Sequence, residues 1–306
     1  MRGKVITVTG PIDPSEMGPT LPHEHIMVDF VGAEQTGRHR YDPADVVATM
    51  LPFVEAVRAQ GVRTFVDCTP MYLARDVAVL QEISRAAGTF ILTNTGQYKE
   101  PYLPRATFEI DAAALADQWI AEWEQGIDGT AVRPGFVKTA VNPEPLAAAQ
   151  KKVIDAAALT SAATGLTIAT HTGRAEPAME VLDIVESRGV APDRWIFVHA
   201  QNETDVGRLL AVARRGAWIE LDGLGETTAD RHMAPLLALL EAGFEGKVLL
   251  SHDAGWYRVG EEPGGKKKPF TFLFDRFVPM MRERGVSSET IHRITVRNPA
   301  EAFTVR

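Results

Sequence analysis

The sequence predicts an α/β protein folded as a single (β/α)8 TIM barrel, and three observations support this class. Short apolar segments alternate with helical patterns along the chain, which is typical of a parallel sheet covered by helices. The alternation gives eight strand–helix units in 306 residues, close to the size of one such barrel. No linker rich in glycine, proline or serine divides the chain. We therefore expect one domain over residues 1–306, with a doubly wound sheet as the alternative.

Strands are expected at the following places, in chain order. An extra strand or hairpin arm at 4–9 precedes the first barrel strand, which includes residues 19–22. The later strands are short runs of Val, Ile, Phe, Leu and Thr, a composition that suits strands buried on both faces. These runs are 64–68, 90–93, 135–138, 166–171, 196–199, 218–221 and 248–251.

Helices are expected between these strands, where apolar residues recur at three- and four-residue spacing. The first helix, 43–60, has an apolar stripe, Asp42 as a capping residue, Pro43 in its first turn and Gly61 after its end, all of which favour a helix with these limits. The others are 76–87, 112–124, 145–164, 177–187, 203–214, 233–241, 271–284, 288–294 and 299–303.

Composition excludes several functional classes. No apolar run approaches the ~20 residues of a membrane helix, and residues 1–10 lack the pattern of a signal peptide. The only cysteine, Cys68, excludes an intramolecular disulfide framework. A net charge of −8 argues against a nucleic-acid partner, and the first strand is not followed by a G-x-G-x-x-G motif for a dinucleotide. We expect a cytoplasmic protein with a small-molecule substrate and no membrane partner.

Side chains that commonly bind metals occur at the ends of several expected strands. His23 and His25 lie two positions apart in an extended segment, so both can face one ion. His171 ends the fifth strand, His199 ends the sixth, and Asp253 follows the eighth. Because the carboxyl ends of barrel strands share the face that holds active sites, we expect these side chains to converge. Nitrogen and oxygen ligands of this kind suit Zn²⁺.

Lys138 ends the fourth expected strand, where a buried amine needs an explanation. One interpretation pairs it with a nearby Asp or Glu. In the other, the neutral amine reacts with CO2 to form a carbamate, whose two oxygens can bridge two metals. Burial and nearby cations lower the pKa of a lysine, which makes that reaction feasible. Both interpretations stay open at this point.

Several short motifs occur in a characteristic order. They are GPTLPHEH at 18–25, GFVK at 135–138, THTG at 170–173, VH at 198–199, SHD at 251–253 and NPAEAF at 298–303. Together they resemble the phosphotriesterase family of the amidohydrolase superfamily over nearly the whole chain. The resemblance implies a (β/α)8 barrel with a binuclear centre of two divalent ions, zinc foremost, with manganese, cobalt or iron as alternatives. It also implies a homodimer.

The resemblance further implies a role for each predicted ligand. His23, His25 and Asp253 would bind the buried ion, His171 and His199 the more exposed ion, and carboxylated Lys138 would bridge the two. A metal-bridging hydroxide would attack the substrate while Asp253 takes up the proton, which makes Lys138 and Asp253 the catalytic residues.

We expect a lactonase or carboxylic-ester hydrolase, with organophosphate triester hydrolysis as a side activity. Phosphorylated sugar lactones and amides are alternative substrates. A non-catalytic binding protein on the same barrel is the alternative from another class, against which the complete ligand set argues.

Five residues are expected to contact the substrate. Tyr98 matches a tyrosine that lactonases of the family place beside the metals, and Asp222 follows the seventh strand, where it can orient a substrate. Trp256 and Tyr257 can wall an apolar pocket. Arg258, with one of the lysines in the same loop, can bind an anionic substituent. For each of them, packing or simple solvent exposure is the competing interpretation.

Overall fold

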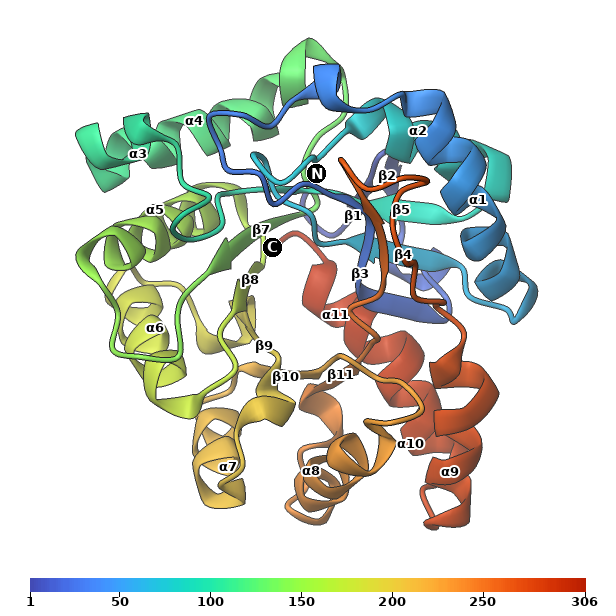
Figure 1. Ribbon diagram of the computed structural model, residues 1–306. Helices are drawn as coiled ribbons and strands as arrows, with labels where there is room; N and C mark the ends of the chain where they lie inside the picture. The colour runs from blue at the N-terminus through green and yellow to red at the C-terminus, as the bar shows by residue number, and fades with distance from the viewer.

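The structure is a computed structural model that describes residues 1–306, with parallel strands at the centre and helices around them (Figure 1). At the N-terminus, β1 (Val5–Thr7) and β2 (Gly10–Ile12) form an antiparallel hairpin, which confirms the expected extension. The parallel strands are β3 (Thr20–Val28), β4 (Thr64–Asp67), β5 (Phe90–Leu92), β6 (Asn94–Thr95), β7 (Phe136–Ala140), β8 (Ile168–His171), β9 (Trp195–Val198), β10 (Trp218–Leu221), β11 (Val248–Leu250) and β12 (Gly255–Arg258).

The parallel strands form two hydrogen-bonded sheets rather than the one continuous eight-stranded ladder that the sequence predicts. One sheet has the order β11-β10-β9-β8-β7-β6 and the other the order β12-β3-β4-β5. The chain passes from one sheet to the other at Thr93 and again at residues 251–254. The second passage is irregular because Asp253 has a φ of 49° and Gly255 a φ of 90°, values that interrupt a regular strand.

Helices cover the outside of the strands, close to the expected positions. The first helix, α1, begins at Pro43, and the carboxylate of Asp42 accepts from the backbone N–H of Ala44 at 2.9 Å, as the sequence predicts. No helix has the length and apolar character needed to cross a membrane. The helices are α1 (Pro43–Ala59), α2 (Val77–Ala87), α3 (Arg105–Glu109), α4 (Ala112–Gln125), α5 (Ala148–Thr164), α6 (Ala175–Ser187), α7 (Val206–Arg214), α8 (Ala229–Glu241), α9 (Val278–Glu283), α10 (Ser288–His292) and α11 (Asn298–Phe303).

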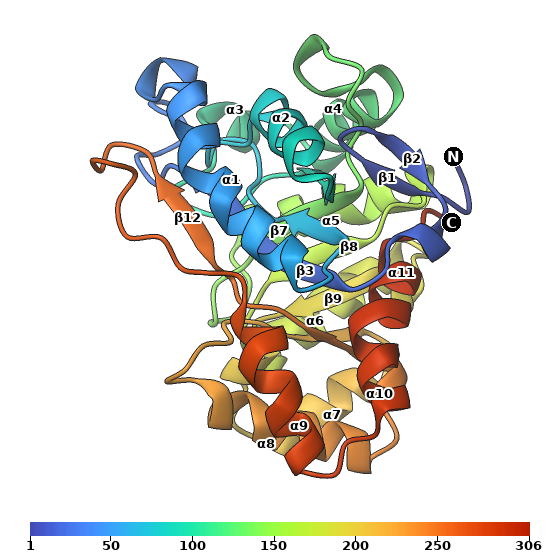
Figure 2. The ribbon, with the colours of Figure 1, turned by 90° about the vertical axis from the view of Figure 1, so that its right-hand side faces the viewer.

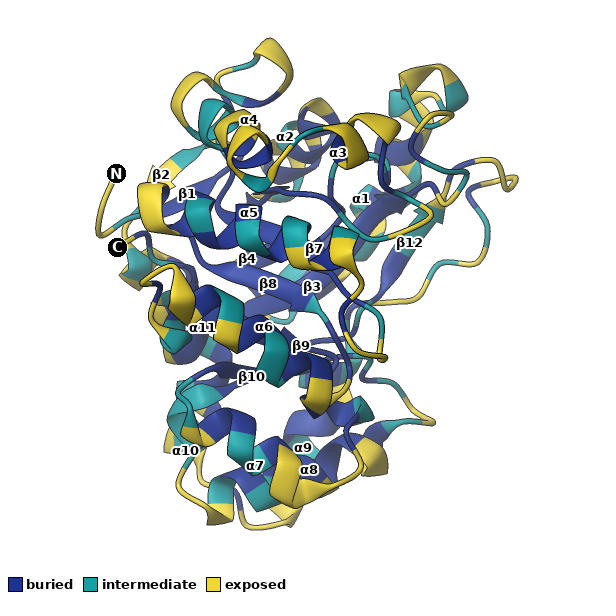
Figure 3. Cartoon of the chain, turned by 90° about the vertical axis from the view of Figure 1, so that its left-hand side faces the viewer, coloured by how far each residue is buried: buried dark blue, intermediate teal, exposed yellow.

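The strands from β3 to β11 are largely buried, and the outer faces of the helices are exposed (Figure 3). A small apolar cluster includes Phe136 of β7 and Ala169 of β8. Lys138 and His171 follow these two residues by two positions on the same strands. Because side chains alternate along a strand, each polar side chain points to the same face as the apolar one before it. The strand pattern therefore places the side chains of Lys138 and His171 next to the apolar cluster that contains Phe136 and Ala169.

The two ends of the molecule differ. Figure 2 shows the N-terminal hairpin and both chain termini at one end and the β12 segment at the other. β12 pairs in parallel with the last residues of β3, from His25 to Val28. The carboxyl end of β3, which carries the first two predicted metal ligands, therefore lies at the β12 end.

Gly255 allows β12 to approach β3, and its replacement is expected to lower the free energy of unfolding. A Cβ at this position would overlap the carbonyl oxygen of His25 and lie 2.6 Å from the Phe270 ring. Gly61 is a matched control, because its φ is 97° and nothing lies within 4 Å of its Cβ position. Both Ala variants should lose about 1–3 kcal/mol from the unfavourable φ, and Gly255→Ala roughly 1–3 kcal/mol more from overlap. Urea unfolding measures both, and equal losses would contradict the close approach.

Candidate metal centre

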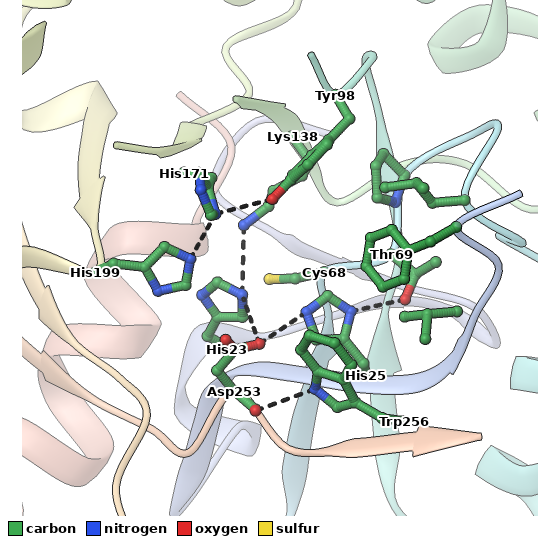
Figure 4. Close-up of a pocket in the computed structure, with 14 residues that line it drawn as sticks. His23, His25, Cys68, Thr69, Tyr98, Lys138, His171, His199, Asp253 and Trp256 are labelled. Atoms are coloured by element: carbon green, nitrogen blue, oxygen red, sulfur yellow. Dashed lines mark hydrogen bonds and ion pairs between the residues drawn. The ribbon is translucent and has the colours of Figure 1, made fainter. Parts of the chain in front are cut away.

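An enclosed cavity of about 60 Å³ lies at the carboxyl ends of the strands (Figure 4). In Figure 4, Lys138 reaches toward His23, with His171 and His199 on one side and His25 and Asp253 on the other. The structure thus brings together side chains that are up to 230 residues apart in the chain. All six predicted metal ligands line the cavity, namely His23, His25, Lys138, His171, His199 and Asp253.

The hydrogen bonds of His25 show which of its nitrogens faces the cavity. Its Nδ1 lies 2.8 Å from the Thr69 hydroxyl, and that hydroxyl donates to the carbonyl oxygen of Met27. Because a hydroxyl has one proton, Thr69 accepts from Nδ1–H, which leaves a lone pair on Nε2. This Nε2 lies 3.1 Å from Asp253 Oδ1. Two acceptors at that distance repel each other unless a proton or a cation lies between them.

His23 and His199 are oriented by two buried carboxylates, Glu220 on β10 and Asp222 just after it. Nδ1 of His23 lies 2.9 Å from Glu220 and 3.2 Å from Asp222, and Nδ1 of His199 donates to the other oxygen of Asp222. Burial and the nearby Lys138 lower the pKa of His23 to about 3, so its ring is neutral. Burial alone would raise the pKa of Asp222, but His199 and His23 hold it well below its usual value. Both rings therefore direct Nε2 into the cavity.

Asp253 faces the two histidines of β3. Its Oδ1 lies 3.1 Å from Nε2 of His25 and 3.8 Å from Nε2 of His23. These separations suit atoms that share one ion through bonds of about 2.0–2.2 Å. Burial raises the pKa of Asp253, but the contact with His25 and the proximity of His23 outweigh this effect and hold the pKa below its usual value.

His171 and His199 face each other across the other side of the cavity. Nε2 of His199 lies 2.7 Å from Nδ1 of His171, and the Tyr98 hydroxyl lies 2.9 Å from the same Nδ1. Burial and the neighbouring His199 lower the pKa of His171 well below its usual value. Burial raises the pKa of Tyr98, so its hydroxyl keeps its proton.

Lys138 is buried at the centre of the site, with 1% of its surface exposed. Its Nζ lies 3.4 Å from Nε2 of His23, and it forms no salt bridge with a carboxylate. The pairing with a nearby Asp or Glu, which the sequence left open, is therefore not found. A buried ammonium without an anionic partner is unfavourable, so this amine needs another chemical partner.

This donor set fits divalent cations. Imidazole nitrogens and carboxylate oxygens converge on one small cavity, where Nε2 of His25 and Oδ1 of Asp253 lie 3.1 Å apart. The atoms of His23, His25 and Asp253 form one group of candidate ligands, and His23, His199 and Asp222 form another. In the second group Asp222 already accepts from the Nδ1 atoms of both rings. We therefore regard Asp222 as the group that orients the two rings.

The residues expected to contact substrate do not all reach the cavity. Tyr98 and Trp256 line it, whereas Asp222 lies behind the imidazoles. Tyr257, the next residue on β12, packs against the apolar core, as strand alternation requires. Arg258 is exposed, with its guanidinium 3.5 Å from Glu261.

Several residues of the site were not identified from the sequence. Thr69 and Glu220 orient imidazoles, and Phe30 and Leu73 wall the cavity. Glu220 could have been identified from the sequence, because it lies two positions before Asp222 and therefore faces the same side of the chain. The sequence contains no pattern that identifies Thr69, because only a tertiary contact places it beside His25.

Comparisons with known proteins agree with this site. Residues 3–303 match the Phosphotriesterase family. The chain is 28% identical over 304 residues to the aryldialkylphosphatase of Saccharolobus solfataricus, covering 96% of this chain and 97% of that protein. It is 27% identical over 290 residues to the phosphotriesterase homology protein of Escherichia coli K12, covering 94% and 98% of the two chains.

A relative named for a different activity is similar over nearly its full length. The N-acetyltaurine hydrolase of Tetraodon nigroviridis is 27% identical over 349 residues, covering 100% of this chain and 99% of that protein. The family match spans almost every residue, and the structure gathers candidate His and Asp ligands in one cavity. The chain therefore belongs to the phosphotriesterase family of the amidohydrolase superfamily and is a metal-dependent hydrolase.

Proposed function

We propose that this protein is a binuclear metal-dependent hydrolase of lactones or carboxylic esters, built on a single-domain (β/α)8 barrel. Family membership and the two chain segments that link the sheets support the barrel. The Tyr98 hydroxyl carries the choice of substrate, because it lines the metal cavity, lies 2.9 Å from His171 and keeps its proton. It can donate that proton in a hydrogen bond to the carbonyl or ring oxygen of a lactone or ester.

The convergence of the six side chains on one cavity supports the ligand assignment that the family resemblance implies. In this proposal, His23, His25 and Asp253 hold one ion and His171 and His199 hold the other. Lys138 would react with CO2 to form a carbamate and release a proton, and this carbamate would be a further ligand and would supply the anion that the buried amine lacks. When bound, two divalent ions would lower the pKa of a water molecule and polarise the substrate carbonyl.

Other side chains of the site have further roles in the proposed reaction. The Asp253 side chain is 23% exposed, compared with 1% for His23 and 11% for His25. It can therefore take a proton from the attacking water and pass it toward solvent. Tyr98 keeps its hydroxyl proton and lies beside His171, where it can donate to a substrate oxygen. Phe30 and Trp256, with rings 5.8 Å apart, can pack against the apolar part of the substrate.

Cations near the cavity support an anionic substituent on the substrate. Nζ of Lys268 lies 5.2 Å and Cζ of Arg258 5.5 Å from the Trp256 ring, and Nζ of Lys99 lies 5.7 Å from the Tyr98 ring. These cations, together with the N-acetyltaurine hydrolase relative, favour amides with an anionic group as the second candidate class.

A substrate panel tests the proposal. It contains γ-lactones, aryl acetates, N-acetyltaurine and a dialkyl aryl phosphate, each followed by acid release or product analysis. We expect kcat/KM for a lactone or ester to exceed that for the phosphate and the amide by about tenfold or more, equivalent to about 1.4 kcal/mol. A higher kcat/KM for N-acetyltaurine would replace our proposal with the amide alternative.

Replacement of Lys268 is expected to affect anionic substrates selectively. Backbone hydrogen bonds with Gly255 fix its position, so Lys268→Gln should raise KM for an anionic lactone about tenfold, as loss of a charged contact implies. Arg258→Ala should have a smaller effect because Glu261 partly neutralises its charge. Lys266→Gln, in the same loop, is the control. An equal rise in KM for neutral and anionic lactones would remove the anion site.

A further inference from the structure

We propose that Glu24 is a positioning residue whose buried carboxylate holds the backbone on both sides of Asp253 and so aims Asp253 at the metal centre. The inference rests on the function proposed above, because it assigns Glu24 a task in that reaction. Glu24 lies between His23 and His25 on β3, yet it does not line the cavity. Because side chains alternate along a strand, it points away from its two neighbours.

Every hydrogen bond to the Glu24 carboxylate comes from one short segment. Oε1 accepts from the Ser251 hydroxyl at 2.8 Å, from the His252 backbone N–H at 3.0 Å and from His252 Nδ1 at 2.6 Å. Oε2 accepts from the Ala254 backbone N–H at 2.9 Å. The donors lie on both sides of Asp253, and they occupy about the four lone-pair sites that a carboxylate offers.

The tautomer of His252 makes one of these bonds stronger. Its Nε2 accepts from the Leu273 backbone N–H at 2.8 Å, so the ring proton is on Nδ1 and is donated to Glu24. A hydrogen bond to an ionised acceptor is about twice as strong as a neutral one. Glu24 thereby connects β3, the segment 251–254 and the chain that follows the β12 loop.

Asp253 needs such support because its backbone is in an unfavourable region. Its φ is 49°, in the left-handed region that non-glycine residues seldom adopt. The Asp253 backbone N–H donates one hydrogen bond to β3, to the His23 carbonyl oxygen at 3.1 Å. The segment also lies where the chain passes between the two sheets and no strand ladder holds it. The geometry therefore makes Glu24 the group that fixes this conformation.

The main test is Glu24→Gln, which keeps the size of the side chain but places an NH2 group against donors. We expect Zn²⁺ affinity at one of the two sites to fall about 10–100-fold, as for loss of other groups that orient ligands. Competition with a chromophoric chelator measures this affinity without turnover. We also expect kcat to fall about 10–100-fold, with KM nearly unchanged because Glu24 does not line the cavity.

Asp76→Asn is the matched control. The Asp76 carboxylate is also buried and also accepts four bonds, from Ala78 N–H, Val79 N–H, the Arg38 guanidinium and the Tyr41 hydroxyl. It makes none to residues 251–254. Asp76→Asn should lower Tm and leave Zn²⁺ affinity and kcat close to those of the original protein. Equal changes in both variants would overturn the proposal, because a purely structural carboxylate would then behave in the same way.

A double-mutant cycle with Asp253→Asn tests whether Glu24 acts through Asp253. If it does, adding Glu24→Gln to Asp253→Asn should change kcat no further, whereas independent effects would multiply. Should Glu24→Gln fail to fold, Glu24→Asp keeps the charge and should show partial losses of both affinity and kcat. If Glu24→Asp and Glu24→Gln both keep full Zn²⁺ affinity, two bound ions and normal turnover, the role of Glu24 is overturned. The proposed function would stand in that case. Absence of metal and turnover in the original protein would instead overturn the proposed function, and this inference with it.

Discussion

Replacing Asp253 with Asn is expected to lower kcat by about 10²–10⁴-fold, the range found when a positioned proton acceptor is lost. The substitution preserves the shape of the side chain but removes the charge that His25 and His23 hold in the ionised form. The measurement is kcat on the best substrate of the panel. Activity within threefold of the original protein would refute the proton role of Asp253.

The same variant needs a control for metal loss, because Asp253 is also assigned as a ligand. The assay is therefore run with increasing Zn²⁺ until the rate no longer rises, and the bound metal is counted by mass spectrometry. A low kcat at full metal occupancy assigns the defect to proton transfer. Recovery of the rate with added metal would show that Asp253 acts as a ligand only.

Removal of metal is expected to abolish turnover and to lower Tm. We expect about two divalent ions per chain after purification without chelators. Each ion at a thousandfold excess over its Kd stabilises the folded state by about 4 kcal/mol, so removal of both should lower Tm by roughly 10 °C in a chain of this size. Calorimetry before and after chelation measures the change.

Re-addition of Zn²⁺, Mn²⁺, Co²⁺ or Fe²⁺ is the control for this experiment. Recovery of both Tm and activity shows that the chelator acted by removing an ion, and the rates rank the metals. Full activity in protein shown to contain no metal would contradict the binuclear proposal. Retention of one ion per chain with full activity would restrict the function to a mononuclear site.

The helices show how far local sequence can predict this fold. The expected helix 43–60 is found as α1, Pro43–Ala59, because its cap, its proline and its apolar stripe are all local signals. β12, Gly255–Arg258, was not expected as a strand. Its partner β3 lies more than 200 residues earlier in the chain, and its own residues suggest a loop.

The strands show a second limit of the same kind. The first strand was expected to include 19–22, with His23 and His25 after it, whereas β3 runs from Thr20 to Val28 and contains both. Pairing with β12 extends it, and β12 can pair only because Gly255 permits the close approach. The expected strands form parallel sheets, but the hydrogen-bonded ladder is interrupted at Thr93 and at residues 251–254. At the second place the left-handed backbone of Asp253 interrupts it.

In the candidate site, too, local sequence predicts some features and tertiary contacts determine the others. Residue types and their positions at strand ends were enough to predict that four histidines, Lys138 and Asp253 converge on one cavity, because strand alternation and a common carboxyl end are rules of local geometry. The partners that determine how those ligands act, such as Thr69 for His25 and Glu24 for the segment around Asp253, come from other strands. No local pattern encodes such a contact, since it exists only after the chain has folded and brought two distant segments within hydrogen-bond distance.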